Sequence, residues 1–444
     1  MNGKQSFFLT LCLGIVIGAG LTMHDAAEAK KSEAVELDLP QNELQTFTEI
    51  YQRIKLHYVD DVAGKVLIEN AIRGMITGLD PHSSFLDTEE YKDLRIGTTG
   101  KFGGLGIEVT MEDGFVKVVS PIDDTPAQRA GIQAGDLVVR LDDKPVKGMT
   151  LSDAVDIMRG EPGDDITLTV VRQGETKPLT ITITRDIIKV QSVKNRMLEP
   201  GFGYIRITQF QARTTEDLQK SIGDLKKKAK DVGFKGLVLD LRNNPGGLLT
   251  AAVGVSDAFL TEGSIVSIRG RNEEDKVVYN AETVIPGDML EDIPVVVLIN
   301  GGSASASEIV AGALQDHARA VIIGTPSFGK GSVQTINELR QGSAVKLTTA
   351  RYYTPSGRTI QAKGIEPDIK LSRVKVEVLD DLGFEPVKES QLEGHLENDK
   401  DKTTEKKDDK DKQLSPEELV RRDYQLYEAL NLLKGLQVVK SMRK

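Results

Sequence analysis

The chain has 444 residues, a length that allows two or three domains. Hydrophobic residues make up 39% of the chain and charged residues 28%, which is typical of a globular protein with a sizeable core. The formal net charge of −10, without a dense basic patch, argues against a nucleic-acid partner.

The N-terminus has the pattern of an export signal. Lys4 precedes an apolar run from Phe7 to Met23, and the small residues of Ala27-Glu28-Ala29 fit a cleavage site. An uncleaved anchor is the weaker alternative, because this run reaches only the lower limit of a membrane span. We expect residues 1–29 to be a signal peptide and the protein to be exported to a bacterial periplasm or cell envelope, free or peripheral to the membrane.

The cysteine content limits the chemistry. Cys12 is the only cysteine and lies within the expected signal peptide. The mature chain would therefore have no disulfide, no thiolate metal site and no cysteine nucleophile. We expect no metal site and no other cofactor.

Residues 30–95 have the pattern of a helical region. Apolar residues recur at helical spacing over residues 42–59, and a second helical stretch runs from Lys65 to Met75. A turn, Gly78-Leu79-Asp80-Pro81-His82-Ser83, follows. We expect this short region to pack on another element or on a second subunit.

Residues 96–187 consist of short strand patterns separated by glycine turns. The loop Gly103-Gly104-Leu105-Gly106 opens the region, a helix pattern covers Leu151 to Met158, and a strand pattern covers Ile166 to Val171. This order resembles a PDZ domain of the bacterial type; a small β-domain without a ligand is the alternative.

The resemblance to a PDZ domain implies peptide recognition by strand addition, with a terminal carboxylate captured by backbone N–H groups after the glycine loop. The residues that it assigns to peptide binding are Gly104, Leu105, Gly106, Ile107, Val109, Leu151, Val155 and Met158.

Residues 188–387 alternate between apolar strands and helices, and we expect part of residues 60–95 to join them. The strand patterns cover 203–207, 237–241, 295–299 and 320–324. Nearly continuous apolar strands between helices predict a mostly parallel, buried sheet with covering helices. Ligand chemistry in such sheets lies beyond the carboxyl ends of the strands.

The C-terminal part begins with a charged linker, for which we expect disorder over residues 388–414. Residues 415–444 follow as one amphipathic helix, opened by Ser415-Pro416-Glu417-Glu418 as a capping box. Its apolar face must be buried on the preceding α/β domain of its own chain, on another subunit or on a separate protein.

Ser305 lies in a loop of small residues, Gly302-Ser303-Ala304-Ser305-Ala306-Ser307, between the strand at 295–299 and a following helix. A hydroxyl at a helix start faces free backbone N–H groups and the positive end of the helix dipole, where a developing oxyanion is stabilised. A serine there is often only an N-cap.

Lys330 follows on the next strand and loop, in a segment that first suggests a phosphate-binding loop. Residues 324–330 satisfy the G-x-x-x-x-G-K pattern. The pattern then requires Ser or Thr for magnesium, and this chain has Gly331. Pro326 also removes a backbone donor, so the segment disfavours an NTPase.

A lysine base would make a histidine unnecessary. His317 follows Ser305 by twelve residues, about 18 Å along a continuous helix and too far for a hydrogen bond. We interpret His317 and His82 as structural, although folding could bring His82 near. A Ser–Lys pair needs a buried lysine with a lowered pKa, and neighbouring apolar residues such as Phe328 suit such a site.

The two segments together resemble the carboxyl-terminal processing (tail-specific) proteases, serine peptidases with a PDZ domain. The motifs are Asn300 to Glu308, with its S-A-S-A-S-E run, and Gly329-Lys330-Gly331-Ser332-Val333-Gln334. The likeness extends from Gly78 to Asp368, most of the mature chain.

The resemblance implies an α/β (α+β overall) fold: a mostly parallel sheet with covering helices, as in the spiral core of crotonase and ClpP, with an inserted PDZ domain and helical elements at both termini. It assigns Ser305 as nucleophile, Lys330 as general base and Gln334 as the residue that orients the amine. The oxyanion donors would be the N–H of Ala306 and that of Gly246 or Gly247, between which spacing cannot choose.

Further expectations follow from the resemblance. Arg159 follows the helix pattern at Leu151 to Met158 and would link peptide binding to the active site. The alternative is an exposed arginine that only caps the end of this helix. The terminal helices resemble dimerisation elements and imply a homo-oligomer, and some members of the family require an adaptor protein.

The function favoured by the sequence is therefore an exported serine endopeptidase. It would recognise accessible C-termini of protein and peptide substrates and process or degrade envelope proteins. The alternatives are a non-catalytic PDZ adaptor or scaffold, which would predict the loss of Ser305 or Lys330, and an NTPase.

Overall fold

The computed structural model describes residues 40–122, 124–189, 191–281, 288–291, 293–372, 374 and 416–442. The expected signal peptide with Cys12 and the expected linker at 388–414 lie outside the described residues. Residues 1–74 and 75–444 form two compact units.

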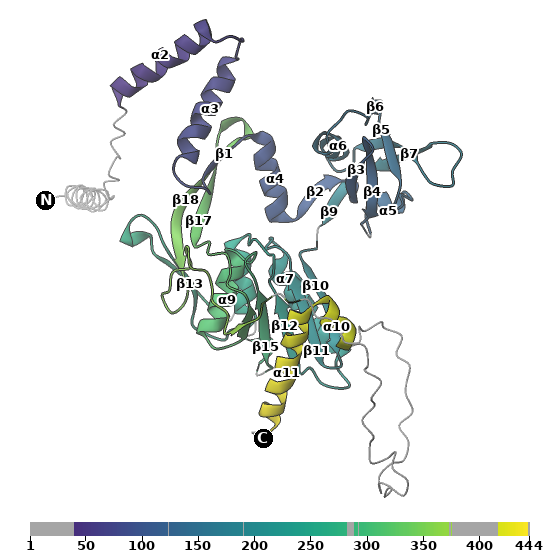
Figure 1. Ribbon diagram of the computed structural model, residues 1–444, viewed down its shortest axis with the longest axis vertical. Coiled ribbons are helices and arrows are strands. Elements are labelled where there is room, and N and C mark those ends of the chain that lie inside the picture. The colour runs from purple at the N-terminus through teal and green to yellow at the C-terminus, as the bar shows by residue number, and fades with distance from the viewer. Residues whose placement is uncertain are drawn as a thin grey trace, which may run out of the picture. The chain divides into compact units, whose positions relative to one another are not determined.

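The first unit contributes helical structure, as its periodicity predicts. Helix α2 spans Gln41–His57 and α3 spans Gly64–Thr77, the two purple helices of Figure 1. No residue of α2 is buried, and its large apolar side chains Leu44, Phe47 and Ile50 are 43–53% exposed. The helix thus presents an apolar surface that its own unit does not cover.

The inserted β-domain has strands where the sequence predicts them. Its elements are β3 (Ile107–Glu112), β4 (Phe115–Pro121), α5 (Pro126–Arg129), β5 (Leu137–Leu141), β6 (Lys144–Pro145), α6 (Leu151–Met158), β7 (Asp165–Val171) and β8 (Leu179–Thr184). The sheet order is β3-β4-β5-β7-β8, with β6 beside β5. In β7, Ile166, Leu168 and Val170 are fully buried at alternating positions, which gives the domain its own core.

A second set of strands forms the main sheet of the larger unit. These are β10 (Val193–Glu199), β11 (Phe202–Ile207), β12 (Gly236–Asp240), β15 (Val295–Ile299), β16 (Val321–Gly324) and β19 (Ile369–Lys370), hydrogen-bonded in that order. Only β10 is antiparallel to its neighbour. The predicted mostly parallel sheet is confirmed.

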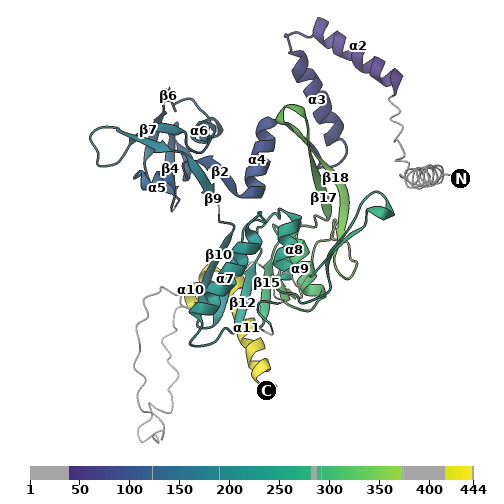
Figure 2. The same cartoon turned by 180° about the vertical axis from the view of Figure 1, so that it is seen from behind.

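Helices cover both faces of this sheet. One face packs against α7 (Thr214–Lys228), α8 (Leu249–Asp257) and α9 (Ala306–Asp316), and the other against the C-terminal helix. Within β12, Leu237 and Leu239 belong to the first core and Val238 to the second, because successive side chains point to opposite faces. Figures 1 and 2 show the two layers from opposite sides.

A smaller sheet completes the α/β part of this unit and shows how the β-domain is inserted. It contains β1 (Ser84–Leu86), β13 (Ser264–Arg269), β14 (Val277–Asn280), β17 (Ser332–Glu338) and β18 (Ala344–Tyr353). Three helical segments follow strands of this sheet: α4 (Thr88–Thr99) follows β1, η1 (Glu273–Asp275) follows β13, and η2 (Arg340–Gly342) follows β17. Ser84 of β1 lies opposite Lys346 of β18. The segment before the β-domain therefore pairs with a strand far beyond it. The chain enters and leaves the domain through β2 (Lys101–Gly104) and β9 (Asp186–Lys189), which pair with each other.

The C-terminal segment differs from the single helix that we expected. It forms α10 (Pro416–Arg422) and α11 (Tyr424–Met442), separated at Asp423. The Asp423 carboxylate accepts a hydrogen bond from the Leu426 N–H (3.0 Å), as an N-cap does, so a new helix begins there. Of the three possible partners, the structure shows the main sheet of the same chain: Leu430 and Leu433 of α11 are at most 2% exposed in the second core.

Candidate active site

Three loops meet at the carboxyl edge of the main sheet, where such sheets bind ligands. They follow β12, β15 and β16, and they are joined to one another by hydrogen bonds. The side-chain amides of Asn243 and Asn300 link the first two loops, since the Asn300 Nδ2 donates to Asn243 Oδ1 (2.9 Å). The Phe328 N–H of the third loop donates to the Ser303 carbonyl (3.0 Å) of the second. The candidate residues therefore lie on three loops that hydrogen bonds hold together at this edge of the sheet.

The three serines of the second loop have different surroundings. Ser303 Oγ donates to the Leu241 carbonyl (2.8 Å), Ser307 Oγ donates to the Asn244 carbonyl (2.9 Å), and both serines are fully buried. Ser305 is partly exposed. The outer serines therefore hold the loops together, and the middle serine has the only one of these three hydroxyls that a substrate could reach.

Ser305 also has an unusual backbone. Its φ of 57° and ψ of −114° lie in a region that residues with a side chain rarely adopt. The strain occurs at the sharp turn from β15 into α9, which projects the side chain at the helix start. A strained strand-to-helix turn is the geometry that exposes nucleophilic serines in other hydrolases.

Glu308 is a buried carboxylate that the sequence analysis did not single out. It accepts hydrogen bonds from the N–H of Ser305 (2.7 Å), the hydroxyl of Ser327 (2.6 Å) and the N–H groups of Gly329 (2.6 Å) and Lys330 (2.9 Å). Its burial raises the pKa of the carboxyl, and the four donors oppose that shift. One side chain thus fixes the backbone of both Ser305 and Lys330. The S-x-x-E spacing of a capping box was the signal that could have identified it.

The same contacts separate the Lys330 loop from a phosphate-binding loop. A phosphate cradle needs free backbone N–H groups that point at the ligand. In this chain the N–H groups of Gly329 and Lys330 already point at the Glu308 carboxylate. An anionic side chain therefore occupies the place where the NTPase hypothesis would put phosphate.

Lys330 lies in a setting that favours a neutral amine. Its pKa is lowered by burial and by the positive charge of Lys346, while Glu308 and Asp80 act in the opposite direction. The expected contribution of Phe328 to that burial is wrong, because this side chain is 63% exposed. The Phe328 N–H donates to the Ser303 carbonyl, and the ring is exposed to solvent.

The structure does not join the Lys330 amine to its expected partners. Within the described residues, no hydrogen bond connects its Nζ to Ser305 or to Gln334. The Gln334 amide nitrogen donates instead to Ser332 Oγ (2.9 Å) and Thr348 Oγ1 (3.3 Å). A β-bulge between Val333 and Gln334 redirects this side chain, and sequence spacing could not reveal that.

Asp80 and His82 belong to a turn beside these residues. Asp80 accepts hydrogen bonds from the N–H of His82 (2.8 Å), from the hydroxyl of Ser83 (2.7 Å) and from that of Thr348 (3.1 Å). These bonds, led by that of Ser83, lower the pKa of Asp80 to about 2 against the cost of burial. The pKa of His82 is lowered by burial and by Lys330, which places its ring within electrostatic range of the amine.

His317 lies at the other end of α9 from Ser305. Its Nε2 lies 2.8 Å from the Ser264 carbonyl oxygen, and the residue is the C-cap of the helix. This confirms its structural interpretation and excludes it as a partner of Ser305 in this structure.

The candidate oxyanion donors lie where the first two loops touch. A methyl group built on Gly246 would lie 2.7 Å from Ser305 Cβ, so this position requires glycine. The N–H of Gly246 donates to Asn244 Oδ1 (2.9 Å). Within the described residues, the N–H groups of Gly247 and Ala306 have no partner. The available pair of donors is therefore Ala306 and Gly247.

Tyr352 is a second residue that the sequence analysis did not identify. Its hydroxyl lies 2.8 Å from Ser305 Oγ, and the residue is only 3% exposed. It reaches the site from β18, 47 residues beyond Ser305, and no local pattern signals such a contact.

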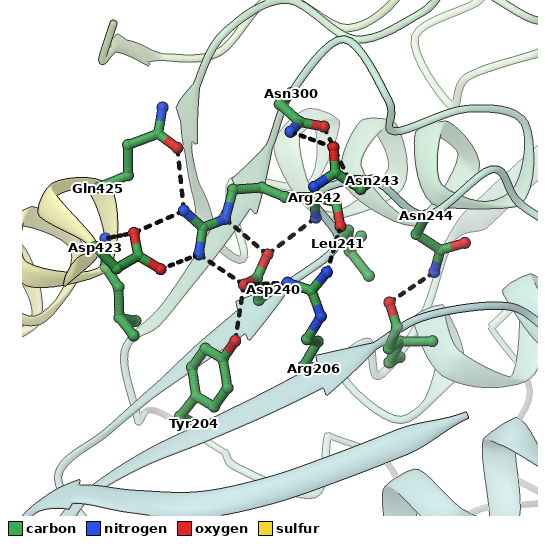
Figure 3. A network of polar contacts seen from close by, with 12 residues as sticks. Tyr204, Arg206, Asp240, Leu241, Arg242, Asn243, Asn244, Asn300, Asp423 and Gln425 are labelled. Atoms are coloured by element: carbon green, nitrogen blue, oxygen red, sulfur yellow. Dashed lines mark hydrogen bonds and ion pairs between the residues drawn. The ribbon is translucent and has the colours of Figure 1, made fainter. Parts of the chain in front are cut away.

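The first loop is anchored from behind by a polar network, drawn in Figure 3. Asp240, at the end of β12, accepts from the Tyr204 hydroxyl (2.8 Å) and from the guanidinium groups of Arg206 (3.0 Å) and Arg242 (2.8 Å). Arg242 also donates to Asp423 (2.8 and 2.6 Å), between α10 and α11. Burial opposes its charge, but the bonds to Asp423 and Asp240 raise the pKa of Arg242 above its usual range.

The inserted β-domain has a groove beside its first strand. A cavity of about 170 Å³ is lined by Phe102, Gly104, Leu105, Gly106, Ile107, Val109, Val155, Met158 and Arg159. Seven of the eight residues assigned to peptide binding are among them. Leu151 is the exception and packs instead against the core of the domain. Within the described sheet, β3 pairs only with β4, so its other edge is available to an added strand.

Arg159 connects this groove to α4. It follows α6 as its C-cap, and its Nη1 lies 2.6 Å from Asp93 Oδ1 of α4. Its guanidinium also lies 5.6 Å from the centre of the Phe102 ring at the edge of the groove. These contacts go beyond those of an exposed arginine at a helix end.

Three parts of the chain match models of known protein families. Residues 201–371 match the model of peptidase family S41, residues 103–183 that of the PDZ domain, and residues 16–90 that of the activating protease CtpB N-terminal domain. A carboxy-terminal-processing protease of Bartonella bacilliformis is 52% identical over 398 residues, 88% of each chain. The chain belongs to the carboxy-terminal processing protease family.

Two further proteins are similar to the chain at lower identity. The carboxy-terminal processing protease CtpA of Bacillus subtilis is 36% identical over 372 residues, 83% of this chain and 78% of the relative. A solved photosystem II D1 C-terminal processing protease is 33% identical, with 74% of this chain and 93% of the other covered at a TM-score of 0.42. The family and domain matches show that the chain is a serine-type peptidase with a PDZ domain.

Among the described residues, no helix combines the length and apolarity of a membrane span. No group of three or more His, Cys, Asp or Glu side chains in the same residues could hold a metal ion.

Proposed function

We propose that the protein is an exported serine endopeptidase that recognises the C-termini of its substrates and cleaves them with Ser305 and Lys330. The carrying observation is the difference among the three loop serines. Ser303 and Ser307 are buried and bonded to backbone carbonyls, while Ser305 is accessible, strained and placed at a helix start.

In the proposed reaction, the neutral Lys330 amine takes the proton of the Ser305 hydroxyl as Oγ attacks the substrate carbonyl carbon. The carbonyl electron pair moves onto its oxygen, which the N–H groups of Ala306 and Gly247 would stabilise. Collapse breaks the peptide bond, and the Lys330 ammonium gives its proton to the leaving amine. Water then attacks the acyl-enzyme as the Lys330 amine takes its proton, and the resulting ammonium returns a proton to Ser305 Oγ as the C–Oγ bond breaks.

This reaction requires the Lys330 amine to approach Ser305 from where it lies now. The backbone of Lys330 is held by Glu308, so the approach is a rotation of the flexible side chain. Gln334 is proposed to orient the amine in that state, and the carbonyl oxygen of its side chain has no hydrogen-bond partner within the described residues.

The groove of the PDZ domain would bind the substrate's C-terminal residues as a strand added to the edge of β3. Its apolar lining favours apolar terminal side chains. Arg159 is the proposed link between this groove and the active site, because it contacts both the groove ring Phe102 and Asp93 of α4.

We also propose export to the periplasm or cell envelope, directed by residues 1–29, with envelope proteins as substrates. A homo-oligomer through the terminal helices is proposed from the exposed apolar side chains of α2. The involvement of an adaptor protein belongs to the same proposal.

The test is cleavage of an unstructured protein with an apolar C-terminus by the purified full chain. Ser305→Ala and Lys330→Ala should each abolish cleavage while leaving thermal unfolding and the binding of a C-terminal peptide unchanged. Lys363→Ala, which removes an exposed lysine, is the matched control and should cleave normally. Cleavage that survives either active-site substitution would refute the assigned pair, and would favour other residues of the same peptidase.

A further inference from the structure

Tyr352 contacts both halves of the candidate active site. Its hydroxyl oxygen lies 2.8 Å from Ser305 Oγ, and its backbone N–H donates to the carbonyl of Gly331 (2.9 Å), the residue after Lys330. The side chain comes from β18 and is 3% exposed, so its position is set by packing in the first core. A buried residue of the smaller sheet thus contacts Ser305, the proposed nucleophile, directly.

The direction of this hydrogen bond follows from counting donors and acceptors. A phenol has one proton to donate, and leaving that proton unpaired in a buried site is costly. Within the described residues, Ser305 Oγ is the only hydrogen-bond partner of the Tyr352 hydroxyl. The phenol therefore donates to Oγ, and the serine's own proton remains available to another acceptor.

The phenol also remains protonated. Burial raises the pKa of Tyr352 well above its usual value, and the nearby Glu308 adds to that shift. Tyr352 is therefore a donor at neutral pH and cannot be the base that activates Ser305, a role that stays with Lys330.

We propose that Tyr352 is a catalytic residue, which donates a hydrogen bond to Ser305 Oγ while that oxygen loses and regains its proton. The inference rests on the proposed function, in which Ser305 is the nucleophile. It adds a donor on the nucleophile itself, separate from the N–H groups that stabilise the substrate oxyanion.

The proposal fits the balance of the reaction. In acylation the Oγ–H bond breaks, its proton moves to Lys330 Nζ, and an Oγ electron pair forms the bond to the carbonyl carbon. In deacylation the C–Oγ bond breaks, and Oγ takes that electron pair and regains a proton from Lys330. Tyr352 keeps its own proton throughout. Its hydrogen bond is strongest when Oγ is most negative and weaker when Oγ is an ester oxygen, so it lowers both barriers selectively.

The first experiment compares Tyr352→Phe with Tyr353→Phe in the full chain. Tyr353 is the neighbouring tyrosine, whose ring lies 4.2 Å from the guanidinium of Arg269 and whose hydroxyl has no partner within the described residues. Tyr352→Phe should lower kcat/KM by about 10- to 100-fold, as expected for one hydrogen bond to a charged oxygen. Tyr353→Phe should change it less than about twofold, and both should keep the unfolding temperature and affinity for a C-terminal peptide.

The second experiment separates donation from packing. Fluorinated tyrosines incorporated at position 352 make the phenol a stronger donor with almost the same shape. If Tyr352 donates to Oγ, kcat/KM rises with phenol acidity until the phenol ionises; a packing role predicts a flat series. A flat series, or a Tyr352→Phe variant as fast as the parent or faster, would overturn the proposal.

Ser305→Ala, measured in the same assays, keeps the two claims distinct. If Ser305→Ala still cleaves, the proposed nucleophile is wrong. If Ser305→Ala is inactive and Tyr352→Phe is fully active, only the role of Tyr352 is wrong.

Discussion

At the scale of single residues, Glu308 connects the two loops that carry the proposed chemistry. Its two oxygens each accept two hydrogen bonds, and three of the four donors are backbone N–H groups. Backbone donors cannot rotate away as side chains do, so the carboxylate fixes the backbone positions of Ser305 and Lys330. The four donors satisfy a carboxyl group that is fully buried, which offsets the cost of removing it from water.

Glu308→Gln should therefore destabilise the protein and slow cleavage. The substitution places an NH₂ group against N–H donors that now face a carboxylate oxygen, which leaves about two donors unpaired. We expect a loss of about 2–4 kcal/mol in the free energy of unfolding by urea denaturation, and a lower kcat/KM. Glu366→Gln, at an exposed position, is the control and should cost less than about 0.5 kcal/mol. Equal stability of the two variants would contradict the role of Glu308.

The electrostatics of Lys330 give a prediction for the pH dependence of cleavage. The base must be neutral, so kcat/KM should rise with pH through the pKa of Lys330, which burial and Lys346 lower. Lys346→Gln removes a positive charge that disfavours the ammonium form. The pKa of Lys330 then rises, and the ascending limb of the pH–rate profile moves to higher pH. Lys363→Gln should leave the limb in place, and a limb that also stays in place for Lys346→Gln would count against Lys330 as the base.

Among the residues of the candidate site, the sequence could identify those that lie in a short, local motif. The loop at Ser305 and the segment at Lys330 were recognisable because each lies in one short motif. The contact of Tyr352 with Ser305 depends on how β18 is placed beside the loop, and the direction of Gln334 depends on a β-bulge. Neither the pairing of distant segments nor a single extra residue in a strand has a sequence signature of comparable strength.

At the scale of elements, α10 and α11 are attached to the sheet by an apolar face and by polar contacts, of which the more buried ion pair is called the anchor below. The apolar periodicity predicted the face, and the partner stayed open because many surfaces can cover an apolar stripe. The anchor is the pair Arg242 and Asp423, in which the arginine side chain is 10% exposed and the aspartate 30%. Arg242 is also the second residue after β12, so the helices hold the start of the loop that carries Gly246 and Gly247.

Asp423→Ala should release this anchor. It removes two hydrogen bonds to a largely buried guanidinium and the N-cap of α11, and we expect a loss of about 2–4 kcal/mol in the free energy of unfolding. Hydrogen exchange should accelerate first in α11. The control is Lys434→Ala, which breaks the more exposed pair with Glu199 and should cost less than about 1 kcal/mol. Similar losses in the free energy of unfolding for both substitutions would show that the anchor stabilises the helices no more than the Lys434–Glu199 pair does.

At the scale of the whole molecule, burial is distributed unevenly between the two units. The three hydrophobic cores all lie within residues 75–444, whereas α2 in the first unit buries no residue. An amphipathic helix with an uncovered apolar face is usually completed by a partner. The proposed homo-oligomer would supply that partner as a second copy of the chain.

Ile50→Asp should then lower the molecular mass measured by light scattering, because it places a charge on the exposed apolar surface of α2. Gln45→Asp introduces the same charge at an exposed polar position of that helix and is the matched control. The control should keep the parent's mass at the same protein concentration. An unchanged mass for Ile50→Asp would exclude this surface as the contact between copies.

The pairing of β2 with β9, where the chain enters and leaves the β-domain, affects how such an enzyme can change during evolution. Lys101 lies opposite Lys189 and Gly104 opposite Asp186, so the two chain crossings are neighbouring strands, about 5 Å apart. That is the spacing of a simple hairpin, and it imposes no length or shape on what is inserted beyond it. A recognition module with adjacent termini can thus be exchanged as a unit, without altering the order of the peptidase strands. Substrate choice and bond cleavage can diversify separately within one polypeptide.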